Sequence, residues 1–205
     1  MTNLPPVRYE DDQLQISTVV VGPLDNNVFF VRCRHTGKAL MVDAADSPLL
    51  LTSLCGDLGV DAVVETHGHP DHIQAVPAVR TAGYAVWVTA GDAGMLPESD
   101  GLIEDGQVFE VGRLRIHAIH TPGHTPGSVC FRIDGSPVLL SGDTLFPGGP
   151  GLTRTPEGDF PLIIRSIEQR LFTLPDDTIV MPGHGKDTTI GTERPHLQEW
   201  IARGW

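Results

Sequence analysis

Hydrophobic positions in the first part of the chain form three short runs. These runs are Gln15–Val21, Val28–Cys33 and Ala39–Val42, and the turn residues Gly22-Pro23 and Thr36-Gly37 stand between them. Runs of this length that are rich in Val, Ile and Phe and bounded by turn residues are typical of β-strands. The pattern therefore predicts a sheet near the N-terminus.

Helices and strands alternate in the next part of the chain. Ser47 followed by Pro48 is typical of a helix start, which predicts a helix up to Leu58 with Ser47 as its N-cap. A proline within a later helical pattern indicates a bend, because it removes a backbone donor. The further elements expected here are a buried strand at Val60–Glu65, a helix at Ile73–Arg80 that is interrupted or bent near Pro77, and a strand at Tyr84–Thr89.

The second half of the chain repeats this arrangement. A helix is expected from Pro161 to Leu171, with Asp159 as its cap, because apolar residues recur there at helical spacing. Two groups of strands, each followed by helices, predict an α/β protein in which two sheets pack face to face with helices outside. The remaining expected elements are strands at Gln107–Val111, Leu114–His120, Ser128–Ile133, Pro137–Leu140 and Thr178–Met181, and a helix near Arg194–Ala202.

Composition narrows the class of protein. A chain of 205 residues with 40% hydrophobic residues suits one well-buried domain, so we expect a single domain over residues 1–205. No apolar run approaches the roughly 20 residues that span a bilayer, and Met1–Asp12 has no signal-peptide core, which predicts a cytoplasmic protein without a membrane partner. The net charge of −12 argues against nucleic-acid binding, which needs a basic surface. Three widely spaced cysteines are expected to be buried apolar residues: Cys33, Cys55 and Cys130.

The strongest chemical signal is the segment Thr66-His67-Gly68-His69-Pro70-Asp71-His72, which directly follows an apolar strand. Three imidazoles and a carboxylate in six residues are costly to bury unless a cation binds them. Alternate residues of an extended segment point to one side, so His67 and His69 can reach one ion. Gly68 and Pro70 then turn the chain, which can direct Asp71 and His72 to a neighbouring point. The segment alone predicts two adjacent pairs of metal ligands.

Three later segments each place one more ligand candidate at a strand end or tight turn. His124 lies in Thr-Pro-Gly-His-Thr, Asp143 in Ser-Gly-Asp-Thr and His184 in Pro-Gly-His-Gly, and a glycine beside each allows close backbone approach. Together with the first segment they give five histidines and two aspartates for a site of two metal ions. Four other histidines are interpreted as solvated or locally hydrogen-bonded: His35, His117, His120 and His196.

These motifs make the chain resemble the metallo-β-lactamase superfamily, and within it the short bacterial glyoxalase II-like hydrolases of the hydroxyacylglutathione hydrolase type. The resemblance runs from about Val20 to Arg194 and includes Thr-Pro-Gly-His-Thr-Pro-Gly-Ser and Ser-Gly-Asp-Thr-Leu-Phe. It implies a four-layer αββα sandwich with the metal ions at one edge of the sheets. It also implies that His67, His69 and His124 bind the first ion, that Asp71, His72 and His184 bind the second, and that Asp143 bridges them.

The ligand set also separates branches of this superfamily. Flavodiiron oxidoreductases have Glu where His69 stands, and class B β-lactamases commonly lack a His at the position of His72. The RNA-processing members usually carry RNA-binding arms, and the net charge of −12 argues against them. The resemblance therefore favours a small-molecule hydrolase.

Two cations about 3.5–4 Å apart share a water and lower its pKa from 15.7 towards about 7. We expect the resulting hydroxide to attack a carbonyl carbon while one ion stabilises the oxyanion, with Asp71 or the second ion assisting the leaving group. A thioester is the preferred substrate class, because a thiol with a pKa of about 8.5 leaves without strong acid help. Histidine and carboxylate ligands suit Zn²⁺, with Fe or Mn as alternatives. Asp43 either orients a ligand histidine or caps a turn.

The resemblance is weaker at the substrate side. Only 21 residues follow His184, so we expect no C-terminal helical domain of the kind that binds glutathione in full-length glyoxalase II. Leu152 stands near the position of the lysine that grips glutathione in those enzymes. Arg154 is either a replacement anchor for a carboxylate or a solvated loop residue, and Phe146 either lines a pocket or belongs to the core.

Three alternatives to the thioesterase remain open. A persulfide dioxygenase would hold a single Fe(II) by His67, His124 and Asp143, but that family has Arg-Thr-Asp where this chain has Leu152-Thr153-Arg154. A lactonase of the same superfamily would use the same hydroxide on an ester carbonyl. A non-catalytic metal module is disfavoured, because structural zinc sites are closed four-coordinate cages, often with cysteine.

Overall fold

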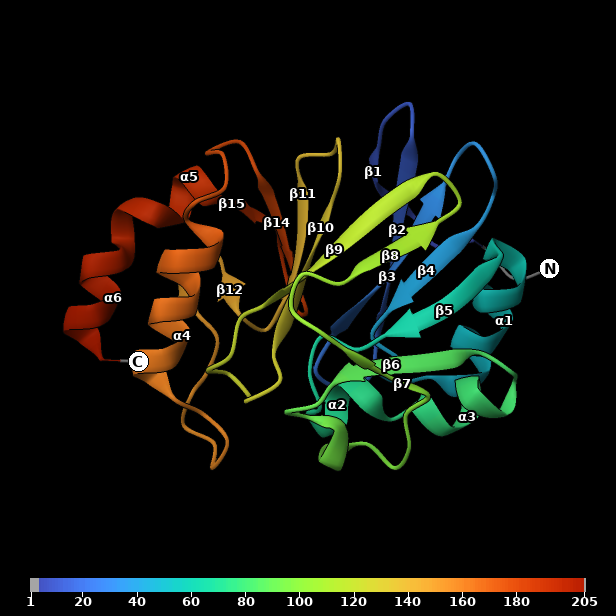
Figure 1. Cartoon of the computed structure of the whole chain (residues 1–205), viewed down its shortest axis with the longest axis horizontal. Coiled ribbons are helices and arrows are strands. Elements are labelled where there is room, and N and C mark those ends of the chain that lie inside the picture. The colour runs from blue at the N-terminus through green and yellow to red at the C-terminus, as the bar shows by residue number, and fades with distance from the viewer. Residues whose placement is uncertain (1–3, 205) are drawn as a thin grey trace.

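The computed structural model describes residues 4–204, in which two β-sheets lie face to face with helices on both outer sides (Figure 1). The first sheet is antiparallel through its first four strands and parallel through the rest. Its strands follow the order of the chain: β1 (Val7–Glu10), β2 (Leu14–Val21), β3 (Asn26–Cys33), β4 (Ala39–Val42), β5 (Val60–Val64), β6 (Ala85–Thr89) and β7 (Gly101–Ile103).

The second sheet is antiparallel except where β11 and β14 run parallel. A two-stranded ribbon of β12 (Leu145–Phe146) and β13 (Gly149–Pro150) follows β11 in the chain. From one edge to the other the sheet contains β15 (Thr188–Thr189), β14 (Ile179–Pro182), β11 (Val138–Gly142), β10 (Val129–Ile133), β9 (Leu114–His120) and β8 (Val108–Val111).

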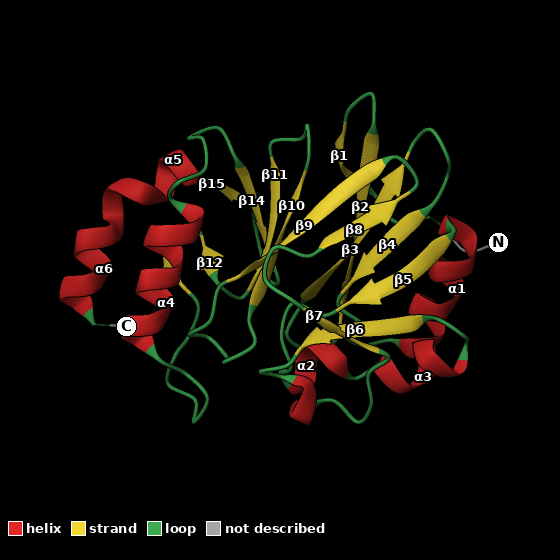
Figure 2. Cartoon of the chain, viewed as in Figure 1, coloured by secondary structure: helices red, strands yellow, loops and turns green. Residues whose placement is uncertain are grey.

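The helices cover the two outer faces, as Figure 2 shows. The first sheet carries α1 (Pro48–Leu58), α2 (Pro70–Ile73) and α3 (Val76–Thr81). The second carries α4 (Phe160–Ser166), which continues as a π-helical turn over Ile167–Leu171, and then α5 (Ile190–Glu193) and α6 (Leu197–Arg203). Short 3₁₀ turns lie at Ala93–Met95 and Arg194–His196. In the part of the chain that the structure describes, no helix is long and apolar enough to cross a membrane.

Three layers of buried side chains hold this arrangement together. Between the sheets, Ile16 and Phe29 belong to the same cluster as Phe131 and Leu140 of the opposite sheet. Fully burying one such side chain stabilises the fold by about 1.5–3 kcal/mol. Two outer clusters join the first sheet to α1 and α3, and the second sheet to α4 and α6. The αββα sandwich predicted from the sequence is therefore confirmed. Each sheet is packed on both of its faces, against the other sheet and against helices.

One local prediction was wrong in detail. Ser47 precedes α1, but its backbone is left-handed (φ 55°) and its hydroxyl makes no cap hydrogen bond; its N–H donates to the Asp46 carboxylate instead. The helix that was expected to be interrupted or bent near Pro77 is interrupted just before it, between α2 and α3, where the N–H groups of Gln74 and Ala75 donate to the carbonyls of Ala45 and Ala44. The cap of α4 was predicted correctly, since Asp159 Oδ1 accepts from Leu162 N at 2.9 Å.

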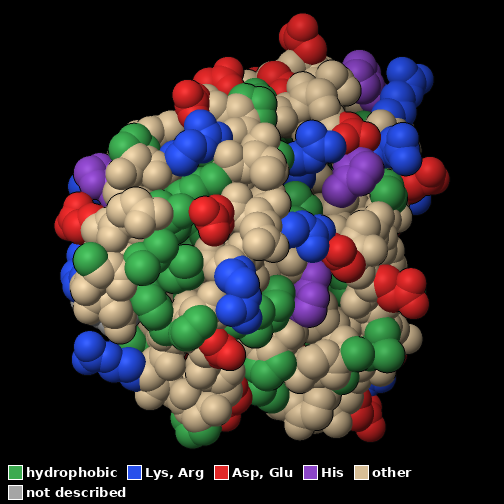
Figure 3. All heavy atoms as spheres, turned by 60° about the vertical axis from the view of Figure 1, so that its left-hand side comes forward, with side chains coloured by type: hydrophobic (Ala, Val, Ile, Leu, Met, Phe, Trp, Pro, Cys, Tyr) green, Lys and Arg blue, Asp and Glu red, His purple; other side chains and the backbone are tan. Residues whose placement is uncertain are grey.

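Surface charge is mixed despite the acidic total. On the face that Figure 3 turns towards the viewer, Lys and Arg side chains are interspersed with Asp and Glu side chains and with patches of hydrophobic ones. All three cysteines are buried and free, as predicted from the sequence.

Candidate metal centre

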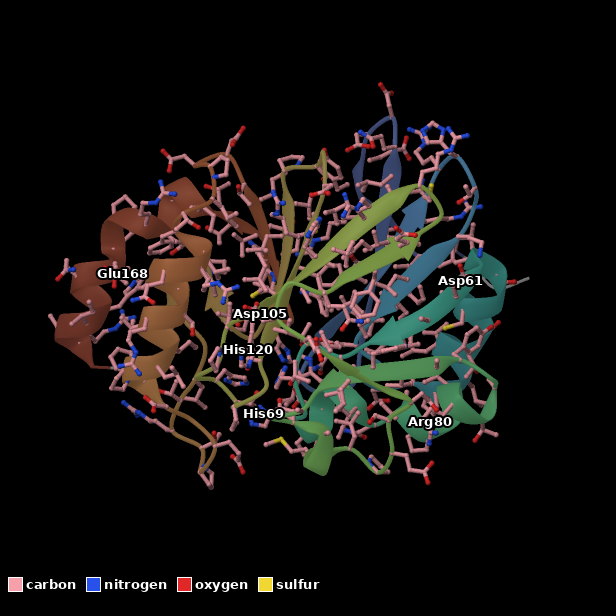
Figure 4. All side chains as sticks on the ribbon, in the orientation of Figure 1. Asp61, His69, Arg80, Asp105, His120 and Glu168 are labelled. Atoms are coloured by element: carbon pink, nitrogen blue, oxygen red, sulfur yellow. The ribbon has the colours of Figure 1, made fainter. Side chains whose placement is uncertain are left out.

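The seven predicted ligands lie at one edge of the sandwich, where strands of both sheets end; Asp71 and His72 lie on the short helix α2, and the other five lie on loops. The segment His67–His72 follows β5, Asp143 follows β11 and His184 follows β14. Two backbone hydrogen bonds join the sheets here, from Val129 N to Thr66 O (2.9 Å) and from Asn27 N to Gly183 O (2.7 Å). Figure 4 marks this edge with the label of His69. The structure therefore brings together candidates that are more than 100 positions apart in the sequence.

One group of three histidines consists of His67, His69 and His124. One ring nitrogen of each lies within 4.8 Å of the others. The Nδ1 atom of His69 is 2.9 Å from Nε2 of His124. The Nε2 atoms of His67 and His69 are buried and have no hydrogen-bond partner among the described residues. Burial and the neighbouring imidazoles lower the pKa of His67, so this ring is neutral and its free nitrogen can bind a metal ion.

A second group consists of Asp71, His72 and His184, again with ligand atoms within 4.8 Å. The Nε2 atoms of His72 and His184 are 3.1 Å apart. Asp71 Oδ2 lies 3.5 Å from the first of these atoms and 3.3 Å from the second. Burial raises the pKa of Asp71, but the neighbouring imidazoles of His184 and His72 and the hydrogen bond from Asn26 together outweigh it and hold that pKa well below its ordinary range. This group therefore presents one carboxylate and two imidazole nitrogens to a common point.

Asp143 lies between the two groups. Its Oδ2 atom is 3.6 Å from Nε2 of His124 and 3.6 Å from Nε2 of His184. Its Oδ1 atom is 3.6 Å from Nε2 of His72 and is buried without a hydrogen-bond partner among residues 4–204. One carboxylate thus faces ligand atoms of both groups, which is the position that a shared ligand requires.

The second ring nitrogen of four ligand histidines is fixed by an acceptor. Carbonyl and carboxylate oxygens only accept, so the Nδ1 atom beside them carries the proton and Nε2 carries the lone pair. Thr66 Oγ1 donates to Asp43 Oδ2 and can accept from His67. The Nδ1 contacts are His67 to Thr66 Oγ1 (3.1 Å), His72 to Asp43 Oδ2 (2.8 Å), His124 to Leu152 O (2.6 Å) and His184 to Leu24 O (2.8 Å).

These tautomers test whether the residues fit a metal ion. When both rings are neutral, the Nε2 lone pairs of His72 and His184 point at each other across 3.1 Å, an arrangement that needs a positive charge between them. Burial lowers the pKa of His72, but the carboxylates of Asp143 and Asp43 outweigh it and raise that pKa to about 9. The same carboxylates favour any cation at this point. The donor set therefore fits divalent metal ions.

Asp43, for which the sequence left two interpretations open, orients a ligand. It is buried, with a left-handed backbone (φ 66°), and its Oδ2 atom accepts from His72 Nδ1. It also accepts from Thr66 N at 2.6 Å. Behind it lies the fully buried Glu65, whose pKa is raised by burial and by the neighbouring charge of Asp43. Asp43 therefore fixes both the tautomer and the position of His72.

Sequence reasoning missed Asp92, a fully buried residue that joins two ligand loops. Its carboxylate accepts from Gly68 N (2.8 Å) in the first loop. It also accepts from Thr125 Oγ1 (2.6 Å) and Gly127 N (2.7 Å) in the loop that carries His124. A signal was present, because Ala90-Gly91-Asp92 follows an apolar strand just as Ser141-Gly142-Asp143 does.

Sequence reasoning also missed Asn26, at the start of β3. Its side chain is 1% exposed, and its Nδ2 atom donates to Asp71 Oδ2 at 2.9 Å. The same atom is 3.4 Å from Nε2 of His184, while Oδ1 has no partner among the described residues. No sequence signal distinguished it from an ordinary turn asparagine. Asn26 therefore contacts two members of the second group.

The glycine predicted to allow close approach beside His184 does so. A Cβ atom on Gly183 would collide with Asp143 Oδ1 and with Cε1 of His72.

Of the predicted substrate-binding residues, Phe146 is half-buried on β12 and Arg154 is exposed on the loop after β13, and their role stays a prediction. The four other histidines have the local surroundings expected: His35 is exposed, His117 contacts Asp134, His120 contacts Pro126 O and His196 contacts Glu199.

Comparisons with a family model and with individual proteins agree on one family. The profile of the metallo-beta-lactamase superfamily matches residues 21–184. The hydroxyacylglutathione hydrolase GloC of Haemophilus influenzae is 33% identical over 158 residues, which are 67% of this chain and 74% of that protein.

Two solved structures extend the likeness to the fold. The BLEG-1 B3 metallo-beta-lactamase is 31% identical, with a TM-score of 0.79 over 89% of this chain and 97% of that one. The protein TTHA1623, solved in a di-iron-bound form, is 30% identical, with a TM-score of 0.76 over 86% of this chain and 96% of that one.

Proposed function

The chain belongs to the metallo-β-lactamase superfamily, and on this premise we propose that it is a hydrolase that uses two divalent metal ions to cleave thioesters. The observation that carries the proposal is the convergence of unpartnered ligand atoms, above all Nε2 of His67 and Oδ1 of Asp143. In the proposed site the first ion takes His67, His69 and His124, the second takes Asp71, His72 and His184, and Asp143 bridges them.

Two such ions would supply a water whose pKa is lowered from 15.7 towards about 7 and positive charge for an oxyanion. The chain's own part is to hold the ligands ready. The carbonyls of Leu24 and Leu152 and the carboxylate of Asp43 each keep one imidazole in the tautomer with a free Nε2. Fixed ligand orientation lets the site bind metal without reorganisation. Asp71 and Asp143 are the proposed catalytic carboxylates.

The thioester is proposed on chemical and comparative grounds. A thiol with a pKa of about 8.5 departs as a thiolate, so its departure needs no strong general acid. The relative in Haemophilus influenzae is named as a hydrolase of a glutathione thioester, and it is 33% identical to this chain. Lactones and β-lactams present the same attacked carbonyl, and they belong in the substrate panel, because a B3 metallo-beta-lactamase is among the similar structures.

Zinc is the proposed metal, since imidazole and carboxylate ligands suit Zn²⁺, and Fe or Mn suit them as well. The di-iron form of a structure that is 30% identical keeps iron among the candidates. A small-molecule substrate, with no nucleic-acid or membrane partner, is part of the same proposal.

The testing experiment compares the wild-type chain with Asp143→Ala, each with its metal counted. We expect the wild type to hydrolyse thioesters, and Asp143→Ala to lose hydrolysis and bound metal together. His117→Ala is the matched control, because His117 contacts Asp134 outside the site. Wild-type-like turnover by Asp143→Ala would contradict the assignment. One iron per chain with oxygen uptake on glutathione persulfide would replace the hydrolase with the dioxygenase.

A further inference from the structure

Two leucines hold ligand histidines through their backbone. The carbonyl of Leu24, in the turn between β2 and β3, accepts from His184 Nδ1 at 2.8 Å. The carbonyl of Leu152, on the loop after β13, accepts from His124 Nδ1 at 2.6 Å. One of these histidines belongs to each group of the metal centre. Leu152 therefore contacts a histidine of the first group of ligand candidates, and Leu24 contacts a histidine of the second group.

Both leucines are exposed, Leu24 by 60% and Leu152 by 50%. Their carbonyls contact two histidines of the metal centre, so both exposed residues lie at the border of the site. Val20, which is 55% exposed, lies on the same hairpin and pairs with Asn27, next to Asn26. It follows Ile16 at even spacing on β2, and Ile16 belongs to the cluster between the sheets. Val20 therefore occupies the strand face that borders the opening between the sheets.

The charge next to Leu24 is negative. Asp25 follows it directly, and the side chain of Asp46 lies close to the Gly22 backbone of the same turn. An anionic substrate group would be repelled on this side, whereas an apolar group would gain contact with exposed hydrocarbon. Exposed apolar side chains gathered around a polar site are typical of ligand-binding surfaces, whereas single exposed leucines need no explanation. Leu49, 88% exposed on α1, lies in the outer helical layer, where it lines a surface hollow with Pro48 and Pro77 and not the metal centre.

We propose that Leu24 and Leu152 form apolar walls on either side of the metal centre and that the preferred substrate is a thioester with an uncharged, apolar acyl group. This inference rests on the proposed hydrolase function and specifies its substrate. An acyl chain placed between the two walls is removed from water at both, which strengthens its binding in proportion to the area covered.

The test measures kcat/KM of the metal-loaded chain for hexanoyl, acetyl and succinyl thioesters of one common thiol. We expect hexanoyl to be the best of the three. Leu24→Ser and Leu152→Ser should each lower the hexanoyl-to-acetyl ratio about tenfold, the size of effect that one apolar contact has on specificity. Leu49→Ser is the matched control and should leave the ratio unchanged. Leu152→Lys should raise the succinyl-to-hexanoyl ratio, because a cation then faces the carboxylate.

The amount of metal that each variant binds shows whether it is still folded, and so whether a changed specificity is due to the lost leucine side chain alone. The histidines bind the leucine carbonyls, which these substitutions keep, so each variant should still bind as much metal as the wild type. Binding of a non-hydrolysable S-hexyl thioether, followed by calorimetry, should weaken in the same variants. An unchanged hexanoyl-to-acetyl ratio in both serine variants would overturn the inference and leave the hydrolase intact. No hydrolysis of any thioester by the wild type would reject the proposed function itself.

Discussion

Oδ2 of Asp43 lies 2.8 Å from Nδ1 of His72, and both side chains are buried. This contact makes His72 present its Nε2 lone pair to the second group of ligands. Asp43→Asn can offer an N–H where the carboxylate accepts, which favours the other tautomer. We predict that Asp43→Asn weakens metal binding about 10–100-fold, as loss of such a partner does at other sites. Competition with a chromophoric chelator measures it.

Glu65→Gln is the control for that experiment. Glu65 lies behind Asp43, and burial and the charge of Asp43 raise its pKa, which favours the neutral carboxyl; glutamine keeps this neutral state and the shape of the side chain. Metal affinity in Glu65→Gln should stay close to the wild-type value. Equal affinity in Asp43→Asn and in the wild type would show that Asp43 does not set the tautomer.

Asp92→Ala should destabilise the fold as well as the site. The substitution leaves the buried N–H groups of Gly68 and Gly127 without their acceptor. Each unsatisfied buried group costs about 1–3 kcal/mol. We therefore expect a lower melting temperature in metal-free and metal-loaded protein alike, together with weaker binding of the first ion. Asp61→Ala, whose side chain is 48% exposed, should melt like the wild type. A melting temperature of Asp92→Ala equal to that of the wild type would show that Asp92 does not hold the two loops together.

Asn26→Ala tests whether the two metal positions can be separated. Asn26 contacts Asp71 and His184 but no member of the first group in the contacts that the structure describes. We predict that the variant binds one ion with wild-type affinity and the second more weakly, seen as two resolved phases in a calorimetric titration. Thr18→Ala is the control, because it removes an unpartnered buried hydroxyl on the adjacent strand. Equal weakening of both ions would contradict the prediction.

Acid should weaken the contact between Arg80 and Asp100. The hydrogen bond from Arg80 and the bond from Val86 N lower the pKa of Asp100 from 3.8 to about 2. The folded pKa lies below the unfolded one, so this contribution to stability is present above pH 4 and is lost as the pH falls towards 2. We predict that Asp100→Asn lowers the free energy of unfolding in urea at pH 7 and has less effect at pH 2.5. Since the side chain is 34% exposed, the effect should be small and reduced by salt. An equal effect at both pH values would rule out the charged contact as its cause.

The sequence was sufficient for the features that local patterns control. Most strand positions follow from short apolar runs, and the first four ligand candidates follow from one six-residue motif. An interruption near Pro77 was expected, but its position at Gln74 and Ala75 was not predictable, because it depends on carbonyls of Ala44 and Ala45 far back in the chain. β7 escaped prediction because Gly101–Ile103 is too short to show a pattern.

The same distinction holds at the site. His124, Asp143 and His184 could be proposed as ligands because each lies in a glycine-containing turn after a strand, and the structure brings them together. Asn26 could not be found, because its function as a contact of Asp71 depends on a partner 45 positions away. The residues proposed to contact the substrate are harder still to predict. Leu24 and Leu152 can be recognised only from the carbonyl contacts that place them beside His184 and His124.

The central claim is a two-ion hydrolytic centre, and metal titration coupled to turnover tests it most directly. Metal-free protein would be titrated with Zn²⁺ while bound metal and thioester hydrolysis are measured on the same samples. We predict that binding saturates at two ions per chain and that hydrolysis rises to its maximum only as the second ion binds. Saturation at one ion, or two bound ions with no hydrolysis of any thioester, would contradict the claim.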